Sequence, residues 1–207
     1  MHIIDEKKDT LKNTSYDDNN KEYMVDSQLS VCSFDKVKEW YIQNKIPNVN
    51  PNPKSNDALY FRDQDCYFIE FKNGKIDRKV TFNLKKKIYD SLFLLFDLKY
   101  VDKNGVCIDS ISYTRKHMTY ILVYNEAKSS SKYPQKQIDD TKDTLVENTH
   151  ISTNRTNLYK QLRALAKEEL ISFDLEQFKN YFFKNVHTYT VEEFQKNFLT
   201  HWEKDMN

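Results

Sequence analysis

Two acids and a lysine near the middle of the chain have the types and spacing for metal-assisted hydrolysis. Glu70-Phe-Lys72 closes an apolar run, and Asp57 opens another run just upstream. Residues two apart on a strand point to the same face, so Glu70 and Lys72 should emerge side by side, and a paired strand can bring Asp57 alongside. Two convergent carboxylates make an oxygen site for Mg²⁺ or Mn²⁺, beside an ammonium that can act on a water or offset phosphate charge.

These residues need a hairpin and a helix to position them. The runs 58–61 and 66–71, rich in Tyr, Phe and Ile, are separated by a polar tetrad and predict a β-hairpin. Apolar residues at helical spacing over 81–98 predict a substantially buried helix lying across the sheet. An earlier helix is predicted to begin at Ser33 and to end before Pro47.

Changes in composition divide the chain into four predicted parts. We expect a flexible polar leader that packs weakly, an α/β core with further strands at 106–113 and 119–125, a flexible insert or long loop, and a helical C-terminal region packing on the core. The predicted fold is α/β, a small mixed β-sheet flanked by helices with an α-helical C-terminal extension. The four parts are residues 1–32, 33–126, 127–153 and 154–207.

The order of acids along these elements resembles the PD-(D/E)xK nuclease superfamily. Glu39 on the first helix, Asp57, Glu70 and Lys72 follow the family's sequence of helix, hairpin, long helix and strand, over residues 33–126, under half of the chain. Asp57 precedes Glu70 by 13 positions, a separation typical of compact resolvase-like members. The resemblance implies a restriction-endonuclease-like core that hydrolyses phosphodiesters with Mg²⁺ or Mn²⁺. Asp57 and Glu70 would hold the metal, Lys72 would act on the nucleophilic water, Glu39 would assist a second metal, and the chain would work as a homodimer.

The motif has competitors within the chain. Seven (D/E)xK triplets occur in the sequence, so the triplet alone does not define a site. Glu126-Ala-Lys128, with Asp109 upstream, also closes a strand-like run, but a Ser-rich segment follows it instead of a helix, and we rank it second. Asn56 stands where the family usually has proline, which leaves Asp63 or Asp65 as substitutes for the first acid.

Basic residues concentrate directly after the motif. The formal net charge of the chain is only +1, so a polyanion site must be a local patch, yet residues 72–87 hold seven basic residues against one acid. Lysines near a helix start oppose the macrodipole unless an anion lies nearby. This segment is either a solvated basic face or, as we expect, a nucleic-acid contact. Its proposed contact residues are Lys75, Arg78, Lys79, Lys85, Lys86 and Lys87.

Several function classes are excluded or unsupported. The only glycines, Gly74 and Gly105, lie too far apart to form a P-loop or a GxGxxG turn. Three scattered cysteines and the histidine spacing suggest neither a disulfide framework nor a zinc site. With no membrane-spanning or signal segment in the sequence, we expect a cytoplasmic protein. The leading hypothesis is a nuclease acting on DNA more than RNA. The alternative is a catalytically inactive nuclease-like binding or interaction module of a mobile-element or defence system.

Overall fold

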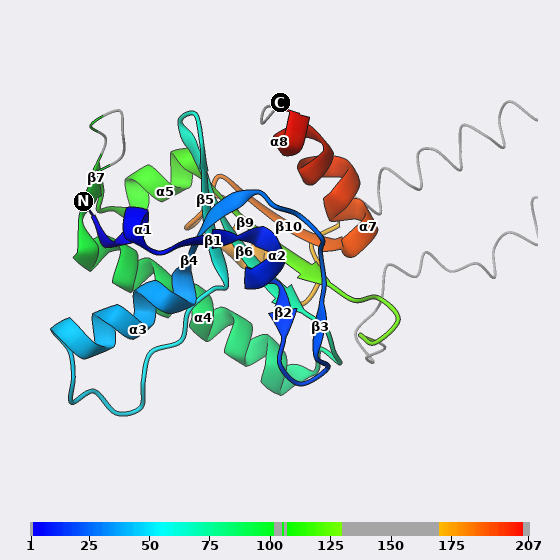
Figure 1. Cartoon of the computed structure of the whole chain (residues 1–207), viewed down its shortest axis with the longest axis horizontal. Helices are drawn as coiled ribbons and strands as arrows, with labels where there is room; N and C mark the ends of the chain where they lie inside the picture. Colours follow the sequence, from blue (N-terminus) through cyan, green and yellow to red (C-terminus); the bar gives the residue numbers. More distant parts are fainter. Residues whose placement is uncertain (1, 102–104, 106, 130–169, 205–207) are drawn as a thin grey trace, which may run out of the picture.

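A six-stranded mixed sheet forms the centre of the protein (Figure 1). The computed structural model describes residues 2–101, 105, 107–129 and 170–204. From β1 to β6, neighbouring strands in the sheet are antiparallel, whereas β9 runs parallel to both β6 and β10. The predicted α/β class with a mixed sheet is therefore confirmed. In spatial order the strands are β1 (Lys8–Thr10), β4 (Ser30–Ser33), β5 (Ala58–Arg62), β6 (Asp65–Lys72), β9 (Met118–Tyr124) and β10 (Asn185–Thr190).

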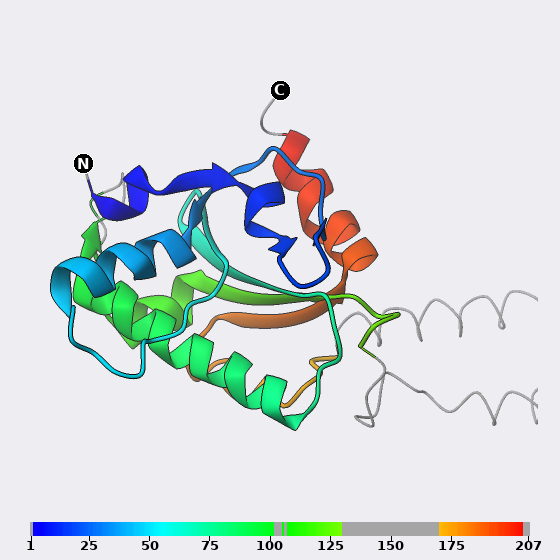
Figure 2. The same cartoon turned by 60° about the horizontal axis from the view of Figure 1, so that its bottom comes forward.

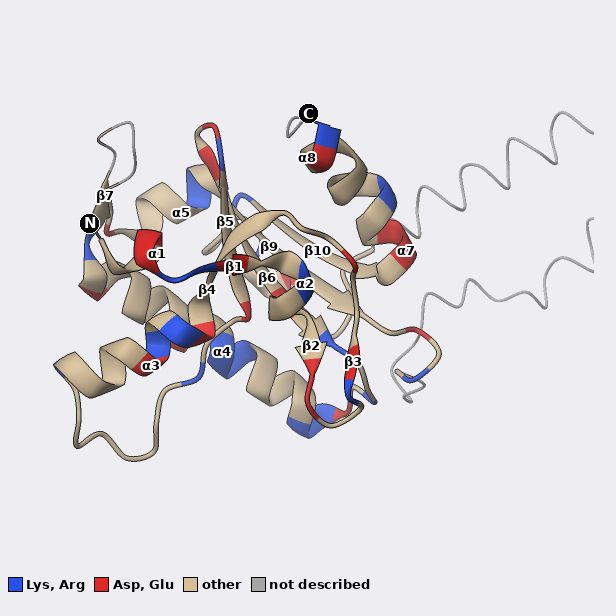
Figure 3. Ribbon diagram, viewed as in Figure 1, with Lys and Arg blue, Asp and Glu red and all other residues tan. Residues whose placement is uncertain are grey.

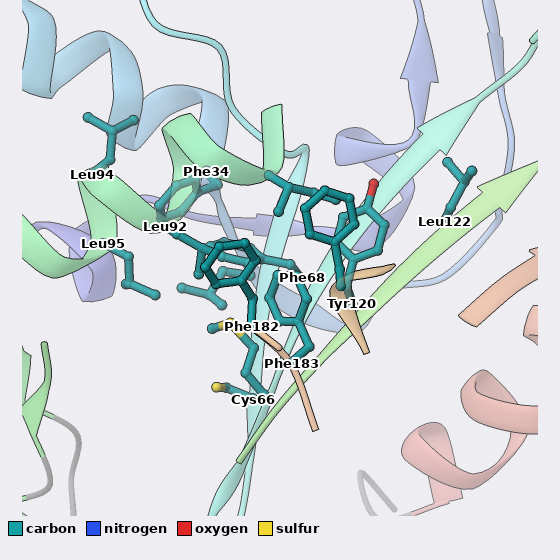
Figure 4. Packing of buried hydrophobic residues seen from close by; sticks show 14 of the residues in the cluster. Phe34, Cys66, Phe68, Leu92, Leu94, Leu95, Tyr120, Leu122, Phe182 and Phe183 are labelled. Atoms are coloured by element: carbon teal, nitrogen blue, oxygen red, sulfur yellow. The ribbon is translucent and has the colours of Figure 1, made fainter. Parts of the chain in front are cut away.

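Two long helices cover one face of this sheet (Figure 2). They are α3 (Phe34–Lys45) and α4 (Arg78–Leu98), and both were predicted. The Asp77 side chain caps α4 by accepting the Val80 N–H at 2.9 Å. Aromatic and aliphatic side chains from the helices and from β6 and β9 fill the core between them (Figure 4). This packing fixes α4 against the strands that carry the candidate acids.

The two ends of the described chain cover the opposite face. A second core cluster contains Leu11 of α2 (Leu11–Thr14) and Trp202 of α8 (Thr200–Lys204), both buried. The Ser27 hydroxyl donates to Glu203 Oε1 at 2.5 Å and links the two ends directly. Between α8 and β10 lie α7 (Val191–Phe194) and the π-helical turn η3 (Gln195–Leu199). The sheet is thus buried on both faces.

The prediction that residues 1–32 form a weakly packed leader is wrong. Besides β1 and α2, this segment contains α1 (Ile3–Glu6) and a small hairpin of β2 (Tyr16–Asp17) and β3 (Glu22–Tyr23). Ile4 and Leu11 are fully buried, and β1 pairs with β4 at the sheet edge. A few widely spaced aliphatic residues anchor the segment without producing a sustained hydrophobic period.

Two further elements differ from prediction. The strand expected over 106–113 is limited to β8 (Cys107–Ile108), which pairs with β7 (Tyr100–Val101) outside the main sheet. Helix α5 (Ile111–His117) follows, because Ser110 accepts the Tyr113 N–H and caps it. By contrast, the strand expected over 119–125 is confirmed as β9, all of whose residues are buried.

The described part of the C-terminal region, residues 170–204, is only partly helical. β10 extends the sheet beside β9, and η2 (Glu176–Phe178) is a single 3₁₀ turn where a helix was expected. Thr190 and Glu193 form a capping box at the start of α7. The predicted insert 127–153 lies almost entirely outside the described residues, as does the beginning of the predicted helical C-terminal region, residues 154–169. Within the described parts of the chain, no helix is long and apolar enough to cross a bilayer.

Candidate functional site

The β5–β6 hairpin places the two predicted acids opposite each other. Ala58 pairs with Ile69, so Asp57 faces Glu70 across the ladder. The Asp57 N–H donates to the Ile69 carbonyl at 3.2 Å, and the Phe71 N–H donates to Asp57 Oδ2 at 2.7 Å. Backbone hydrogen bonds therefore hold the Asp57 carboxylate at the end of the strand pair, next to the start of α3.

Lys87 of α4 lies between the two carboxylates. Its Nζ is 2.9 Å from Asp57 Oδ1 and 2.8 Å from each carboxylate oxygen of Glu70. Lys72 Nζ also lies 2.8 Å from Glu70 Oε1, as expected for residues two apart on one strand face. The Glu70 side chain is fully buried, and that of Asp57 is 15% exposed. Two carboxylates and two ammonium groups thus form one compact, charge-balanced cluster.

Burial and mutual charge shift the pKa values in this cluster. Burial, followed by the neighbouring charge of Glu70, raises the pKa of Asp57 to about 6, although Lys87 and Lys72 oppose the shift. Burial alone would lower the pKa of Lys87, but the charges of Asp57 and Glu70 outweigh it and raise that pKa above its ordinary value. Lys87 is therefore a permanent cation at neutral pH.

The acid of α3 whose charge acts on the cluster is Asp35 and not Glu39. Both line the same pocket, but the Glu39 side chain is exposed to solvent. Asp35, one turn earlier on α3, accepts the Ser55 hydroxyl at 2.5 Å, and its charge raises the pKa of both Asp57 and Lys87. The sequence signal for Asp35 was its position four residues before Glu39 on one helix face.

A cavity of about 810 Å³ opens beside the cluster. The starts of α3 and α4, the end of β6 and the N-terminal segment line it. Lys54 is the additional cation here: its Nζ donates to Asn83 Oδ1 at 2.7 Å, and it forms no ion pair within the described chain. Burial and the charges of Lys87 and Lys86 lower the pKa of Lys54. Sequence reasoning missed Lys54 because it lies in a proline-rich connector without periodicity.

The basic residues predicted to contact nucleic acid lie in three different environments. Lys75, Arg78 and Lys79 are exposed at the start of α4, where Figure 3 shows positive charge. Lys85 lies 3.8 Å from Asp174, and Lys86 lies 2.5 Å from Asp90. Lys87 lies in the carboxylate cluster and not on the surface, so the prediction that it contacts phosphate placed it wrongly.

The rival residues do not converge on a site within the described chain. Glu126 lies in an exposed turn after β9, and Lys128 pairs with Glu22. Asp109 interacts with Cys107 beside β8.

The substitutes for the first acid are also misplaced. Asp63 lies in the turn between β5 and β6, and Asp65 is the first residue of β6, so both are at the opposite end of the hairpin from Glu70. Asp65 there pairs with Lys184 at 3.1 Å. Asp57 is therefore the acid that the hairpin brings to Glu70.

The carboxylates of Asp57 and Glu70 are candidate ligands for a divalent metal. No group of three or more His, Cys, Asp or Glu able to hold a metal occurs in the described residues. Mg²⁺, however, uses one or two carboxylates and completes its octahedron with waters and substrate phosphates. Asp57 and Glu70 fit that pattern, and the space between them already accommodates a cationic group, the Lys87 ammonium.

Comparison with models of protein families, with curated proteins and with solved structures found no match for this chain. The functional interpretation therefore rests on the geometry of the site.

Proposed function

We propose that this protein is a metal-dependent phosphodiester hydrolase, a nuclease of the PD-(D/E)xK type that acts on DNA and uses Mg²⁺ or Mn²⁺. The observation that carries the proposal is the convergence of Asp57, Glu70 and Lys72 beside a cavity at one end of the β5–β6 hairpin. The elements after the hairpin, the long helix α4 and the parallel strand β9, agree with the nuclease core that the sequence suggests.

Each residue would have a distinct part. Asp57 and Glu70 would hold the metal, which supplies Lewis-acid activation of water and of the phosphate. Lys72 would lie next to the reacting phosphate and stabilise its developing negative charge. Lys87 would leave the space between the carboxylates when the metal enters, and its ammonium would then be free to bind substrate. We also propose that the working form is a homodimer, to be tested by its sedimentation mass.

A second candidate is a catalytically silent nucleic-acid-binding module. The observation that favours it is the same Lys87 ammonium, which compensates both acids without a metal. In that case the cluster is a structural ion pair, and the cavity only binds substrate. The two candidates differ in whether a divalent cation can displace Lys87.

Cleavage of plasmid DNA and of labelled DNA and RNA oligonucleotides in MgCl₂ or MnCl₂ tests the proposal. Wild type should cleave DNA, whereas Glu70→Ala and Lys72→Ala should lose about two orders of magnitude or more in rate, because each removes a group that stabilises transition-state charge. At subsaturating metal the rate should also fall as the pH drops through about 6, because protonation of metal-free Asp57 competes with metal binding.

Glu126→Ala is the matched control, because it alters a (D/E)xK triplet that is not assembled into a site in the described chain. It should cleave like wild type. If no protein cleaves but all bind DNA equally, the silent-module candidate takes its place. Cleavage that survives in both Glu70→Ala and Lys72→Ala would overturn the assignment of this site.

A further inference from the structure

We propose that the cavity accepts a single nucleic-acid strand, with its phosphate at Lys54 and a base stacked on Tyr16, and that it discriminates against an intact duplex. This inference rests on the proposed function and specifies the substrate form that the site takes. It follows from a difference between the two walls of the cavity, one formed by α3, α4 and the connector before β5 and the other by the N-terminal segment, which meet at the end of β6. These elements lie on opposite sides of the sheet (Figure 2).

The first wall carries both lysines and the carboxylates Asp35, Glu39 and Asp57. Lys54, Lys72 and Lys87 all line it, together with Asn83 of α4. Lys72 and Lys87 are matched by Glu70 and Asp57. The Lys54 ammonium donates to the neutral Asn83 amide oxygen and forms no ion pair within the described residues, although the Asp90 carboxylate, which accepts the Lys54 backbone N–H at 2.7 Å, partly offsets its charge. An ammonium that is partly desolvated and crowded by other cations is stabilised by an anion, and a backbone phosphate supplies one.

The second wall carries an exposed tyrosine, and the described residues of the N-terminal segment that line it include no lysine or arginine. The β2–β3 hairpin presents Tyr16 and Tyr23, 41% and 50% exposed, with ring centroids 4.8 Å apart. Tyr16 lines the cavity. Asn20 Nδ2 donates to the Asn73 carbonyl at 2.9 Å, which ties the hairpin to the residue after Lys72. Lys54 and Tyr16 thus line one cavity, and a cation for the backbone combined with an aromatic ring for a base is the usual arrangement for binding single strands.

Negative charge on the second wall would repel the phosphate backbone of a complementary strand. Asp17 and Asp18 line the cavity beside Tyr16, and both lie on the hairpin, where Figure 3 shows negative charge. The complementary strand of a duplex would bring its phosphates toward these carboxylates. The cavity volume of about 810 Å³ also falls within the range of sites for small ligands, which suits one or two nucleotides.

Binding without metal separates this inference from the proposed chemistry. We would measure fluorescence anisotropy of a short labelled oligothymidylate in EDTA with the full chain, and compete it with a hairpin duplex. The single strand should bind at least about tenfold more tightly than the duplex. Lys54→Gln should weaken binding about tenfold and reduce the salt dependence by about one counterion. Lys45→Gln, an exposed lysine at the end of α3 outside the cavity, is the matched control.

A second pair of variants tests the aromatic wall. Tyr16→Leu should weaken binding about fivefold or more because it removes the stacking ring, whereas Tyr16→Phe keeps the ring and should bind like wild type. Duplex binding as tight as single-strand binding, or equal loss in the two lysine variants, would overturn the inference. Absence of cleavage together with these affinities would reject the proposed nuclease activity and leave the single-strand site standing.

Discussion

Lys87 determines how the candidate acids can coexist. Two carboxylates buried side by side repel each other, and the raised pKa of Asp57 reflects its desolvation first and that repulsion second. Lys87 bonds to both, and Lys72 bonds to Glu70 alone. Removing one member of a buried ion cluster leaves an uncompensated charge, which is more costly than losing an exposed ion pair. The cluster is therefore stable only with a cation between its acids.

We predict that Lys87→Ala destabilises the protein by about 3–5 kcal/mol in EDTA, because Asp57 and Glu70 are then left without their shared cation. If the acids bind Mg²⁺, MgCl₂ should raise the melting temperature of this variant more than that of wild type. Thermal unfolding followed by circular dichroism in EDTA and in MgCl₂ measures both effects.

The neighbouring substitution Lys86→Ala is the control. Lys86 pairs with Asp90 near the surface, where both side chains are partly exposed, and its loss should cost at most about 1 kcal/mol. Equal stability of the two variants would show that Lys87 is not the counterion of the acids. An unchanged response of Lys87→Ala to MgCl₂ would argue against a metal between them.

The contribution of Lys87 could not be read from the sequence. Its neighbours Lys85 and Lys86 are identical in type, and all three were predicted to contact phosphate. Only the rotation of α4 against β5 and β6 directs Lys87 toward the acids, and that rotation depends on core packing. Asp57, Glu70 and Lys72 were predictable because strand alternation and hairpin pairing are local rules.

At the scale of elements, strong periodicity was the condition for a correct prediction. The β5–β6 hairpin, α3, α4 and β9 each carry a long apolar pattern, and all were found where expected. The short elements of residues 1–32 and the strand β10 were missed. Such strands are specified by the partner they pair with, β4 for β1 and β9 for β10, more than by their own sequences.

The packing of the N-terminal segment can be tested at one residue. Leu11 is fully buried in the second core cluster, so Leu11→Ala should destabilise the protein by about 2–5 kcal/mol. Lys8→Ala, at an exposed position of β1, should change stability by no more than about 0.5 kcal/mol. Urea unfolding measures both. A Leu11→Ala variant as stable as Lys8→Ala would restore the view of residues 1–32 as a loosely attached leader.

At the scale of the whole molecule, one sheet joins two separate cores. The first cluster lies between the sheet and α3 and α4, and the second lies between the sheet and the two chain ends. β5, β6 and β9 contribute side chains to both clusters, because alternate residues point to opposite faces. Detachment of the two helices or of the two chain ends would expose one face of the strands that hold Asp57 and Glu70. We therefore expect both cores to unfold together.

The two tryptophans report on these cores separately. Trp40 of α3 packs against the first cluster, and Trp202 of α8 is buried in the second. Trp40→Phe leaves only Trp202 as a probe, and Trp202→Phe leaves only Trp40. In each variant, the urea midpoint from tryptophan fluorescence should equal the midpoint from far-ultraviolet circular dichroism, since a single cooperative transition gives coincident curves. A fluorescence midpoint for Trp202 below that of circular dichroism would instead mean that the chain ends detach first. In that case the acids would remain on a sheet covered by α3 and α4 alone, and the cavity wall formed by the N-terminal segment would be lost before the site itself.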